Sequence, residues 1–187
     1  MLFNNKELMI LKEFSSDYDK KIYGRDVAKK LKMNQKTASN ILNRLEIEGI
    51  LKFSVKGRNK YYFLNKFNQN IKEILKLIEI SKKIEFLKEY HKIKGLFEEI
   101  EKRTNGVAVI FGSYSKGTAN ERSDLDVFVI GKINDTNDLE RQYSIKINII
   151  KINAGKFNKE EIFIKEVINS HIILKGVEEF MELIWQV

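Results

Sequence analysis

Apolar residues recur at helical intervals in three stretches near the start of the chain. This spacing predicts helices over residues 8–14, over Arg25–Lys32 and from about Gln35 to Glu48. Asn34 is expected to cap the third helix, and Gly49 is the type of residue that ends one. The first third of the chain is therefore predicted to begin with three short helices.

The period of the pattern changes after these helices. Residues 50–55 and 61–64 are rich in β-branched and aromatic side chains, which predicts two strands. The residues between them, Lys56-Gly57-Arg58-Asn59-Lys60, are basic and contain the glycine that a hairpin needs. A β-hairpin with a positively charged turn is expected to follow the helices.

The middle of the chain is predicted to be helical. Residues 68–90 contain no glycine and keep apolar residues at helical spacing, which predicts one or two long amphipathic helices. A further helix is expected over residues 93–103, with a turn at Asn105-Gly106. Two interpretations of the long apolar stripe stay open: a linker packed on its own domains, or a helix through which two copies dimerise.

The last part of the chain combines strands and helices. Short apolar runs predict strands over residues 107–111, 124–130 and 145–151. Residues 158–161 resemble a capping box that opens a helix, and a final helix is expected near residues 177–185. The fold class predicted from the whole pattern is α+β.

The net charge of +8 is concentrated at one end of the chain. Residues 1–67 hold 15 Lys and Arg against 7 Asp and Glu, whereas residues 105–187 hold 10 against 12. A basic excess at the N-terminal end suggests that this end meets a polyanion, with a solubilising basic surface as the alternative.

The composition excludes several classes of site. The chain has no cysteine, which excludes a disulfide framework, a thiol nucleophile and a cysteine zinc site. No apolar run reaches the length of a membrane span and no signal-peptide pattern is present, so we expect no membrane partner and a cytoplasmic location. The two histidines, His91 and His171, are predicted to be structural or surface residues.

Polar and basic side chains lie off the apolar face of the predicted third helix and on the predicted hairpin turn. Such side chains can reach the base edges and phosphates of DNA. The candidate DNA-binding residues are Gln35, Lys36, Thr37, Ser39, Asn40, Arg44, Lys56, Arg58 and Lys60. The alternative is a domain that uses the same solvated face for protein contacts.

The stretch DVAKKLKMNQKTASNILNRLEIEGIL, followed by GRNKYYFL, resembles the winged helix-turn-helix regulators of bacteria and archaea. The resemblance covers roughly residues 5–65 and implies DNA as a partner. Winged-helix proteins often bind two half-sites as dimers, so the resemblance also suggests a homodimer.

The sequence GSYSKGTANERSDLDVFVI carries the candidate chemistry of the C-terminal part. Backbone N–H groups at a strand-to-helix turn can hold a phosphate, which Gly112 allows to approach closely and to which Ser113 offers a hydroxyl. Asp124 and Asp126 are two residues apart in a predicted strand, so they project from the same face. They are candidate ligands for one Mg²⁺ or for a bridged pair of metals. The alternative is that Asp124 caps a turn and Asp126 pairs with a lysine.

The joint pattern G-S-x-x-x-G-x-x-x-x-x-S-D-L-D resembles the DNA polymerase beta-like nucleotidyltransferase superfamily, especially its minimal members. The resemblance covers about residues 92–152. It implies Mg²⁺ and a nucleoside triphosphate as ligands. Asp124 and Asp126 would be the metal-binding and catalytic residues, and the nucleotide would lie against Gly112, Ser113 and Ser123.

A third carboxylate of that family binds metal and serves as base for the attacking hydroxyl, and it is expected on the strand over residues 145–151. Alternation along this strand points to Asn148, whose amide cannot usefully accept a proton. The carboxylates of the preceding loop that could substitute for it are Asp135, Asp138 and Glu140.

The combined prediction has three parts. Residues 1–66 form a winged helix-turn-helix DNA-binding domain, residues 67–91 a helical linker that is a candidate for dimerisation, and residues 92–187 a nucleotidyltransferase-like mixed sheet flanked by helices. The function indicated is a DNA-binding protein that binds Mg²⁺ and a nucleoside triphosphate and transfers a nucleotidyl group to a hydroxyl. Because of Asn148, one alternative stays open: a transcriptional regulator whose second domain is inactive or senses nucleotide. The family resemblance also allows an antitoxin-like partner of a small helical protein.

Overall fold

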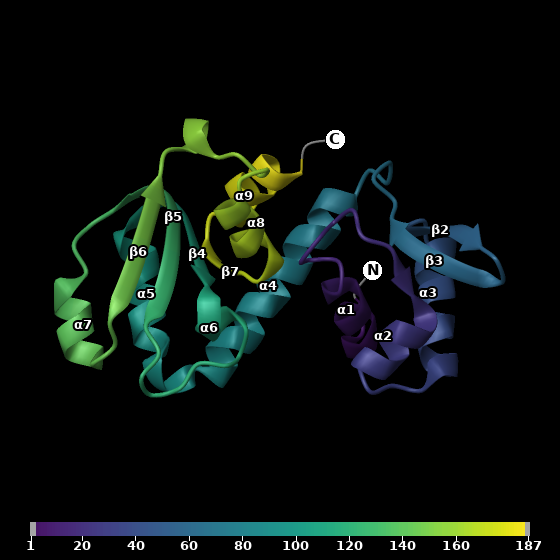
Figure 1. The fold of residues 1–187 in the computed structure, drawn as a ribbon, viewed down its shortest axis with the longest axis horizontal. Coiled ribbons are helices and arrows are strands. Elements are labelled where there is room, and N and C mark those ends of the chain that lie inside the picture. Colours follow the sequence, from purple (N-terminus) through teal and green to yellow (C-terminus); the bar gives the residue numbers. More distant parts are fainter. Residues whose placement is uncertain (1–2, 186–187) are drawn as a thin grey trace. The chain divides into compact units, whose positions relative to one another are not determined.

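The structure, a computed structural model, describes residues 3–185 and divides into two compact units (Figure 1). The first unit is Met1–Ile78 and the second is Glu79–Val187. The boundary falls inside α4 (Ile71–Glu89), a single helix whose first half belongs to one unit and whose second half belongs to the other. Within residues 3–185, no helix combines the length and the apolar character that crossing a bilayer requires.

The N-terminal unit contains three helices before α4 and a three-stranded antiparallel sheet in the order β1-β3-β2. Its elements before α4 are α1 (Asn5–Lys12), β1 (Ile22–Tyr23), α2 (Gly24–Lys30), α3 (Gln35–Ile47), β2 (Leu51–Lys56) and β3 (Asn59–Leu64). The three helices and the hairpin lie where the apolar spacing predicts them. The two-residue strand β1 is too short to leave a pattern in the sequence.

The ends of α3 are formed by the predicted residues. The Asn34 side chain accepts a hydrogen bond from the Lys36 N–H, as an N-cap does. Gly49 follows the helix with φ +72°, a left-handed conformation that glycine adopts without a steric cost. The N-cap of α1 is Asn4, which forms a capping box with Glu7 that the apolar spacing alone does not reveal.

The connection between β2 and β3 is shorter than the sequence predicts. Lys56 pairs with Asn59 across the two strands, so the turn contains only Gly57 and Arg58. Gly57 has φ +62°, as the first central residue of a type II′ turn requires. Lys56 and Lys60 therefore belong to the strands, and only Arg58 projects from the turn itself.

The C-terminal unit is built on a four-stranded mixed sheet in the order β6-β5-β4-β7 (Figure 1). The strands are β4 (Thr104–Phe111), β5 (Leu125–Ile133), β6 (Ile147–Ile152) and β7 (Ile172–Lys175). β5 and β6 are parallel, and the other pairs are antiparallel. The helices are η1 (His91–Ile93), α5 (Lys94–Arg103), α6 (Gly112–Ser115), α7 (Asn137–Tyr143), η2 (Ala154–Lys156), α8 (Ile162–Asn169) and α9 (Val177–Ile184).

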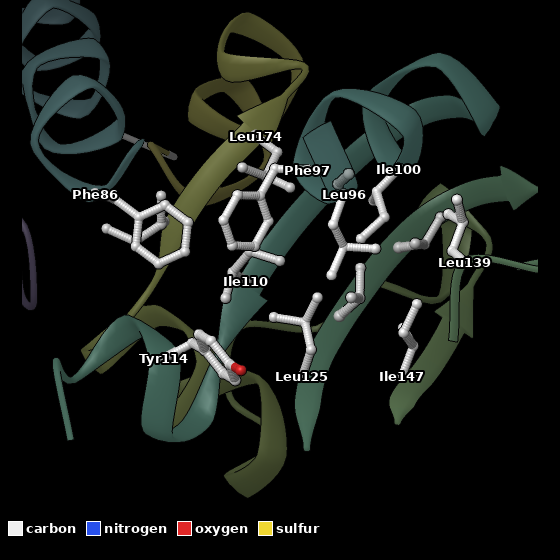
Figure 2. Packing of buried hydrophobic residues seen from close by; sticks show 14 residues of the cluster. Phe86, Leu96, Phe97, Ile100, Ile110, Tyr114, Leu125, Leu139, Ile147 and Leu174 are labelled. Atoms are coloured by element: carbon white, nitrogen blue, oxygen red, sulfur yellow. The ribbon is translucent and has the colours of Figure 1, made fainter. Parts of the chain in front are cut away.

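Helices cover both faces of this sheet. On one face Leu96, Phe97 and Ile100 of α5 pack against buried strand residues such as Ile110 and Leu125 (Figure 2). On the other face the Phe163 ring of α8 lies 5.6 Å from the ring of Phe111 and 5.6 Å from that of Phe128. Side chains alternate along a strand, and Leu125 points to the α5 side of the sheet. Asp126, the next residue, therefore points to the α8 side.

Two predictions of local structure are wrong. Asn105-Gly106 is not a turn but the second and third residues of β4, where Gly106 lies opposite Gly131 of β5. Both glycines have positive φ, and a Cβ on either would overlap a backbone carbonyl oxygen of the facing strand, so the strands continue through a point that admits only glycine. Asn158 does not cap α8: its side chain accepts from the Glu160 N–H, and the helix begins later, at Ile162.

Candidate active site

The turn after β4 is shaped around the Asp126 carboxylate. Gly112 has φ +70°, and a Cβ on this residue would overlap Oδ2 of the Asp126 carboxylate. Phe111, the last residue of β4, pairs directly with Asp126 on β5. A glycine at position 112 therefore allows the backbone of the turn and the carboxylate to approach each other closely.

Hydrogen bonds fix the single helical turn α6 that follows. The Ser115 hydroxyl lies 3.0 Å from the Gly112 carbonyl oxygen and 2.9 Å from that of Ser170, and the Thr118 N–H donates to the Ser113 carbonyl at 3.0 Å. The Ser113 hydroxyl, in contrast, makes no hydrogen bond within the part of the chain that the structure describes. Its donor is thus available to a ligand at the end of β4.

Asp124 and Asp126 lie on the same side of the sheet, as their spacing predicts. Asp124 directly precedes β5, and Asp126 is the second residue of that strand. Both carboxylates are partly exposed, and both accept from the side-chain amide of Asn148 on β6: Nδ2 lies 3.3 Å from Asp124 Oδ2 and 3.1 Å from Asp126 Oδ1. A single amide therefore bridges the two carboxylates.

Asn148 occupies the position that the sequence assigns to a third carboxylate. The parallel register of β5 and β6 pairs Asp126 with Asn148, between the pairs Leu125–Ile147 and Val127–Ile149. Ile147 and Ile149 belong to the apolar side of the sheet, so Asn148 faces the carboxylates. An amide thus completes the trio.

Lys146 is a neighbour of this trio that the sequence argument missed. Its Nζ lies 3.3 Å from Asp124 Oδ2, the oxygen that also accepts from Asn148. The Leu125 N–H donates to the Lys146 carbonyl at 2.8 Å, which holds the lysine backbone beside the start of β5. Alternation along residues 146–148 predicts that Lys146 shares the face of Asn148, but not that its ammonium reaches Asp124.

The loop carboxylates considered as substitutes lie elsewhere. Asp138 accepts two hydrogen bonds from Arg103. These bonds are the main reason why the pKa of Asp138 falls to about 2. Glu140 accepts from the Ile147 N–H at 2.6 Å, and Asp135 accepts from the Asn137 N–H. Across residues 3–185, no three Asp, Glu, His or Cys side chains gather closely enough to bind a metal ion.

Ser123 tightens the turn that leads to Asp124. Its hydroxyl accepts from the Asn120 N–H at 2.9 Å, and its own N–H donates to the Asn120 carbonyl at 2.9 Å. The hydroxyl proton is not used in this bond. Ser123 can therefore donate to a ligand while it shapes the turn.

Tyr114 of α6 packs in the apolar cluster on the α5 side of the sheet, opposite the face that bears Asp126. Its ring is buried and lies 5.1 Å from that of Tyr90. Burial raises the pKa of the Tyr114 phenol, and the negative charge of Asp124 raises it further. The phenol accordingly stays protonated near neutral pH.

A buried ionic cluster joins α4 to the segment between α8 and β7. In this segment, the Ser170 carbonyl accepts the hydrogen bond from Ser115 of α6. His171 Nε2 lies 3.1 Å from Glu79 Oε2 and 3.3 Å from Lys82 Nζ, and its Nδ1 donates to the Ile168 carbonyl at 2.7 Å. Burial raises the pKa of Glu79, but His171 and Lys82 outweigh it and lower the value to about 2. The predicted structural role of His171 agrees with this position, although its partners come from a distant part of the sequence.

The candidate DNA-binding residues differ in how they are presented. Gln35, Lys36 and Asn40 are exposed on α3, and Thr37 and Ser39 are partly buried there. A concavity of about 270 Å³ lies between the start of α3 and the hairpin. Its lining includes Gln35, Ser39, Arg58 and Lys60, together with Arg25, which the sequence argument did not select. Arg25, Arg58 and Lys60 place three positive charges along this concavity.

Arg44 and Lys60 have partners inside the N-terminal unit. Arg44 forms an ion pair with the buried carboxylate of Glu7 and lies 3.9 Å from Glu48. The Lys60 ammonium lies over the Phe53 ring, 4.1 Å from its centre. Arg44 is therefore committed to α1 in the structure, whereas Lys56 and Arg58 are exposed.

Comparisons with known proteins bear on the C-terminal unit. Residues 90–182 match the family model described as "Nucleotidyltransferase domain", which confirms a resemblance to nucleotidyltransferases over this part of the chain. A solved structure described as "Crystal structure of the toxin-antitoxin with AMP-PNP" is similar at 18% identity and a TM-score of 0.37, covering 47% of this chain and 76% of that one. A TM-score of this size carries no argument about function. A comparison with curated proteins found no match.

Proposed function

We propose that the C-terminal unit binds a nucleoside triphosphate with Mg²⁺ and transfers its nucleotidyl group to a hydroxyl, while the N-terminal unit binds DNA. The observation that carries the first half is the convergence of Asp124 and Asp126 on one amide, beside a turn in which a Cβ on Gly112 would overlap Asp126. The match of residues 90–182 to the nucleotidyltransferase family supports the same half.

The residues present fit a divalent cation. Mg²⁺ is commonly bound by one or two carboxylates together with substrate phosphates, and Asp124 and Asp126 provide such a pair on one face. The closeness of Gly112 to Asp126 places the backbone of the phosphate turn beside the same carboxylate. Bound Mg²⁺ would neutralise charge on the phosphates and favour attack at phosphorus.

The chain's own groups position the nucleotide. The Ser113 hydroxyl and the backbone N–H groups of α6 would donate to phosphate oxygens, with Ser123 on the other side of the turn. During transfer the acceptor oxygen bonds to the α-phosphorus, the bond to the pyrophosphate breaks, and the acceptor hydroxyl loses its proton. Asn148 cannot take this proton, so we expect it to pass to water.

Label transfer tests this half. The protein is incubated with each labelled ribonucleoside triphosphate, Mg²⁺ and RNA, DNA or polypeptide acceptors, beside an Asp124→Ala/Asp126→Ala variant. We expect Mg²⁺-dependent labelling that the variant abolishes, with a rate that rises steadily with pH. Labelling that is equal in the variant would refute the assignment of the site.

The second half of the proposal concerns the N-terminal unit. Its order of elements, with α3 exposed beside a two-residue basic turn, supports a winged helix-turn-helix that inserts α3 in the major groove. Gln35, Lys36, Thr37, Ser39 and Asn40 would face the bases, and Lys56, Arg58 and Lys60 the phosphates. Fluorescence anisotropy with labelled duplex DNA at several salt concentrations measures this binding, and a salt-independent signal would argue against it.

A second candidate function is a regulator whose C-terminal unit binds the nucleotide without turning it over. The amide at position 148, directly opposite Asp126, favours this candidate because it removes the usual base. The two functions are distinguished by labelling with the wild type beside an Asn148→Asp variant. If the wild type transfers, both proteins should label acceptors, the variant about 10²–10⁴-fold faster. Labelling by the variant alone would favour the regulator.

A further inference from the structure

The charge distribution around Asp124 differs from what two metal ions need. Asp124 Oδ2 has two donors, the Lys146 ammonium at 3.3 Å and the Asn148 amide at 3.3 Å. We propose that this site holds a single divalent cation with the nucleotide, and that Lys146 supplies the second positive charge by binding a phosphate oxygen. The inference rests on the proposed nucleotide binding and specifies how the phosphates are neutralised.

The ligand set is the first reason. Two metals about 3.5–4 Å apart each need several oxygen ligands. Asp124 and Asp126 are the carboxylates at the site, and no further Asp, Glu, His or Cys joins them within the described residues. Asn148 directs its Nδ2 to both carboxylates, and a rotated amide would offer one neutral carbonyl oxygen. This set is sufficient for one cation but leaves a second with too few ligands.

The formal charge is the second reason. Two carboxylates and one ammonium leave the site with a net charge of minus one. A carboxylate at position 148 and a neutral residue at position 146 would make it minus three. The attraction that draws a second divalent cation is therefore much weaker here, since Coulomb energy scales with the charge at the site.

The position of Lys146 is the third reason. Its side chain is 66% exposed, so the ammonium is free to turn on its flexible stem once a cation occupies Asp124. Lysine binds phosphate as a point charge and needs no fixed orientation. Its backbone is held beside β5 by the hydrogen bond from the Leu125 N–H, so the side chain begins close to the carboxylates.

Metal stoichiometry tests the proposal with the full chain. Mn²⁺ replaces Mg²⁺, and each of the four α,β-imido ribonucleoside triphosphates, in which the bond that transfer would break is blocked, is supplied in turn at saturating concentration in equilibrium dialysis. We expect about one Mn²⁺ per chain in the wild type, and about two in a Lys146→Ala/Asn148→Asp variant, which has the third carboxylate without the ammonium. Two Mn²⁺ per wild-type chain would overturn the proposal.

Nucleotide affinity supplies the second measurement. Lys146→Ala should weaken binding of the imido analogue about tenfold, the loss of one charge-assisted contact. Lys151→Ala is the matched control, because it removes an exposed lysine of β6 from the face opposite to that of Asn148. If both variants bind equally well, Lys146 has no such role. If the wild type binds none of the four analogues, the proposed nucleotide binding itself fails, and that result differs from either of the others.

Discussion

Replacing Asn148 by Asp should change both the stability of the C-terminal unit and its response to Mg²⁺. The two side chains have nearly the same shape, so the substitution exchanges an amide nitrogen for a carboxylate oxygen at the same place. In the wild type this nitrogen donates to Asp126 Oδ1 at 3.1 Å and to Asp124 Oδ2 at 3.3 Å. The variant replaces two attractive contacts by two contacts between negative charges.

The expected cost follows from these separations. Two unit charges at such distances repel by about 1 kcal/mol in water and by about 5 kcal/mol at an effective dielectric constant of 20. The Asp124 side chain is 40% exposed and Lys146 offsets part of its charge, so the repulsion energy lies closer to the value in water. We expect a loss of about 2 kcal/mol in the free energy of unfolding, or roughly 8 °C in the melting temperature of a unit of this size.

Mg²⁺ should reverse the effect. A cation that binds the folded state at about 100 times its dissociation constant stabilises it by about 2.7 kcal/mol, and a third carboxylate makes the cation bind more tightly. Differential scanning calorimetry in EDTA and in excess Mg²⁺ measures both effects. Asn153→Asp, which adds the same charge in an exposed loop, is the control.

Two results would contradict this reasoning. If Asn148→Asp melts at the wild-type temperature in EDTA, the carboxylates are not as close to position 148 as the structure has them. If Mg²⁺ raises its melting temperature no more than that of the wild type, the three side chains do not form a cation site.

Three other substitutions test separate features. Gly112→Ala introduces a Cβ that overlaps Asp126 at a residue with positive φ, so we expect about tenfold or more weaker nucleotide binding in a filter or calorimetric assay. The control is Gly155→Ala, whose Cβ has open space around it and which should bind nucleotide normally. Glu79→Gln tests the buried cluster, in which the pKa of Glu79 is about 2. The stabilisation from the ionised Glu79 is present at neutral pH and is lost as the pH falls from about 4.5 to 2, so the variant should be less stable by on the order of 3 kcal/mol at pH 7. Its stability should also fall less steeply with acid than that of the wild type. Arg58→Ala should weaken DNA binding and reduce the slope of its salt dependence by about 1. Arg44→Ala should mainly destabilise the fold, by about 2 kcal/mol, because it leaves the buried Glu7 carboxylate without its ion pair. Equal effects of the two variants on DNA affinity would argue against this distinction.

Local signals were sufficient for most of the elements. The helix α3 has a strong apolar face, an Asn cap and a terminal glycine, and each of these acts within a few residues of the chain. The carboxylate pair was equally predictable, because two residues in one strand share a face whatever surrounds them. The position of Asn148 was predicted from the family resemblance and from alternation, and the parallel pairing of β6 with β5 places it opposite Asp126.

Features that depend on distant residues were not predictable. Asn105-Gly106 has the composition of a turn, and only the facing glycine of β5 explains why the strand continues through it. Arg44 is a plausible DNA contact by its place on α3, but its guanidinium pairs with a carboxylate of α1. His171 has partners on α4, about 90 positions earlier in the chain. Each outcome depends on tertiary packing, which a single sequence does not display.

The pairing of Asn148 with Asp126 also has a genetic meaning. Codons for asparagine and aspartate differ only in their first base, so one transition would place a carboxylate opposite Asp126 without altering the backbone or the volume of the side chain. The amide already lies within hydrogen-bonding distance of both carboxylates. A lineage carrying this fold could therefore lose or regain a proton acceptor in a single mutational step, with the rest of the site unchanged.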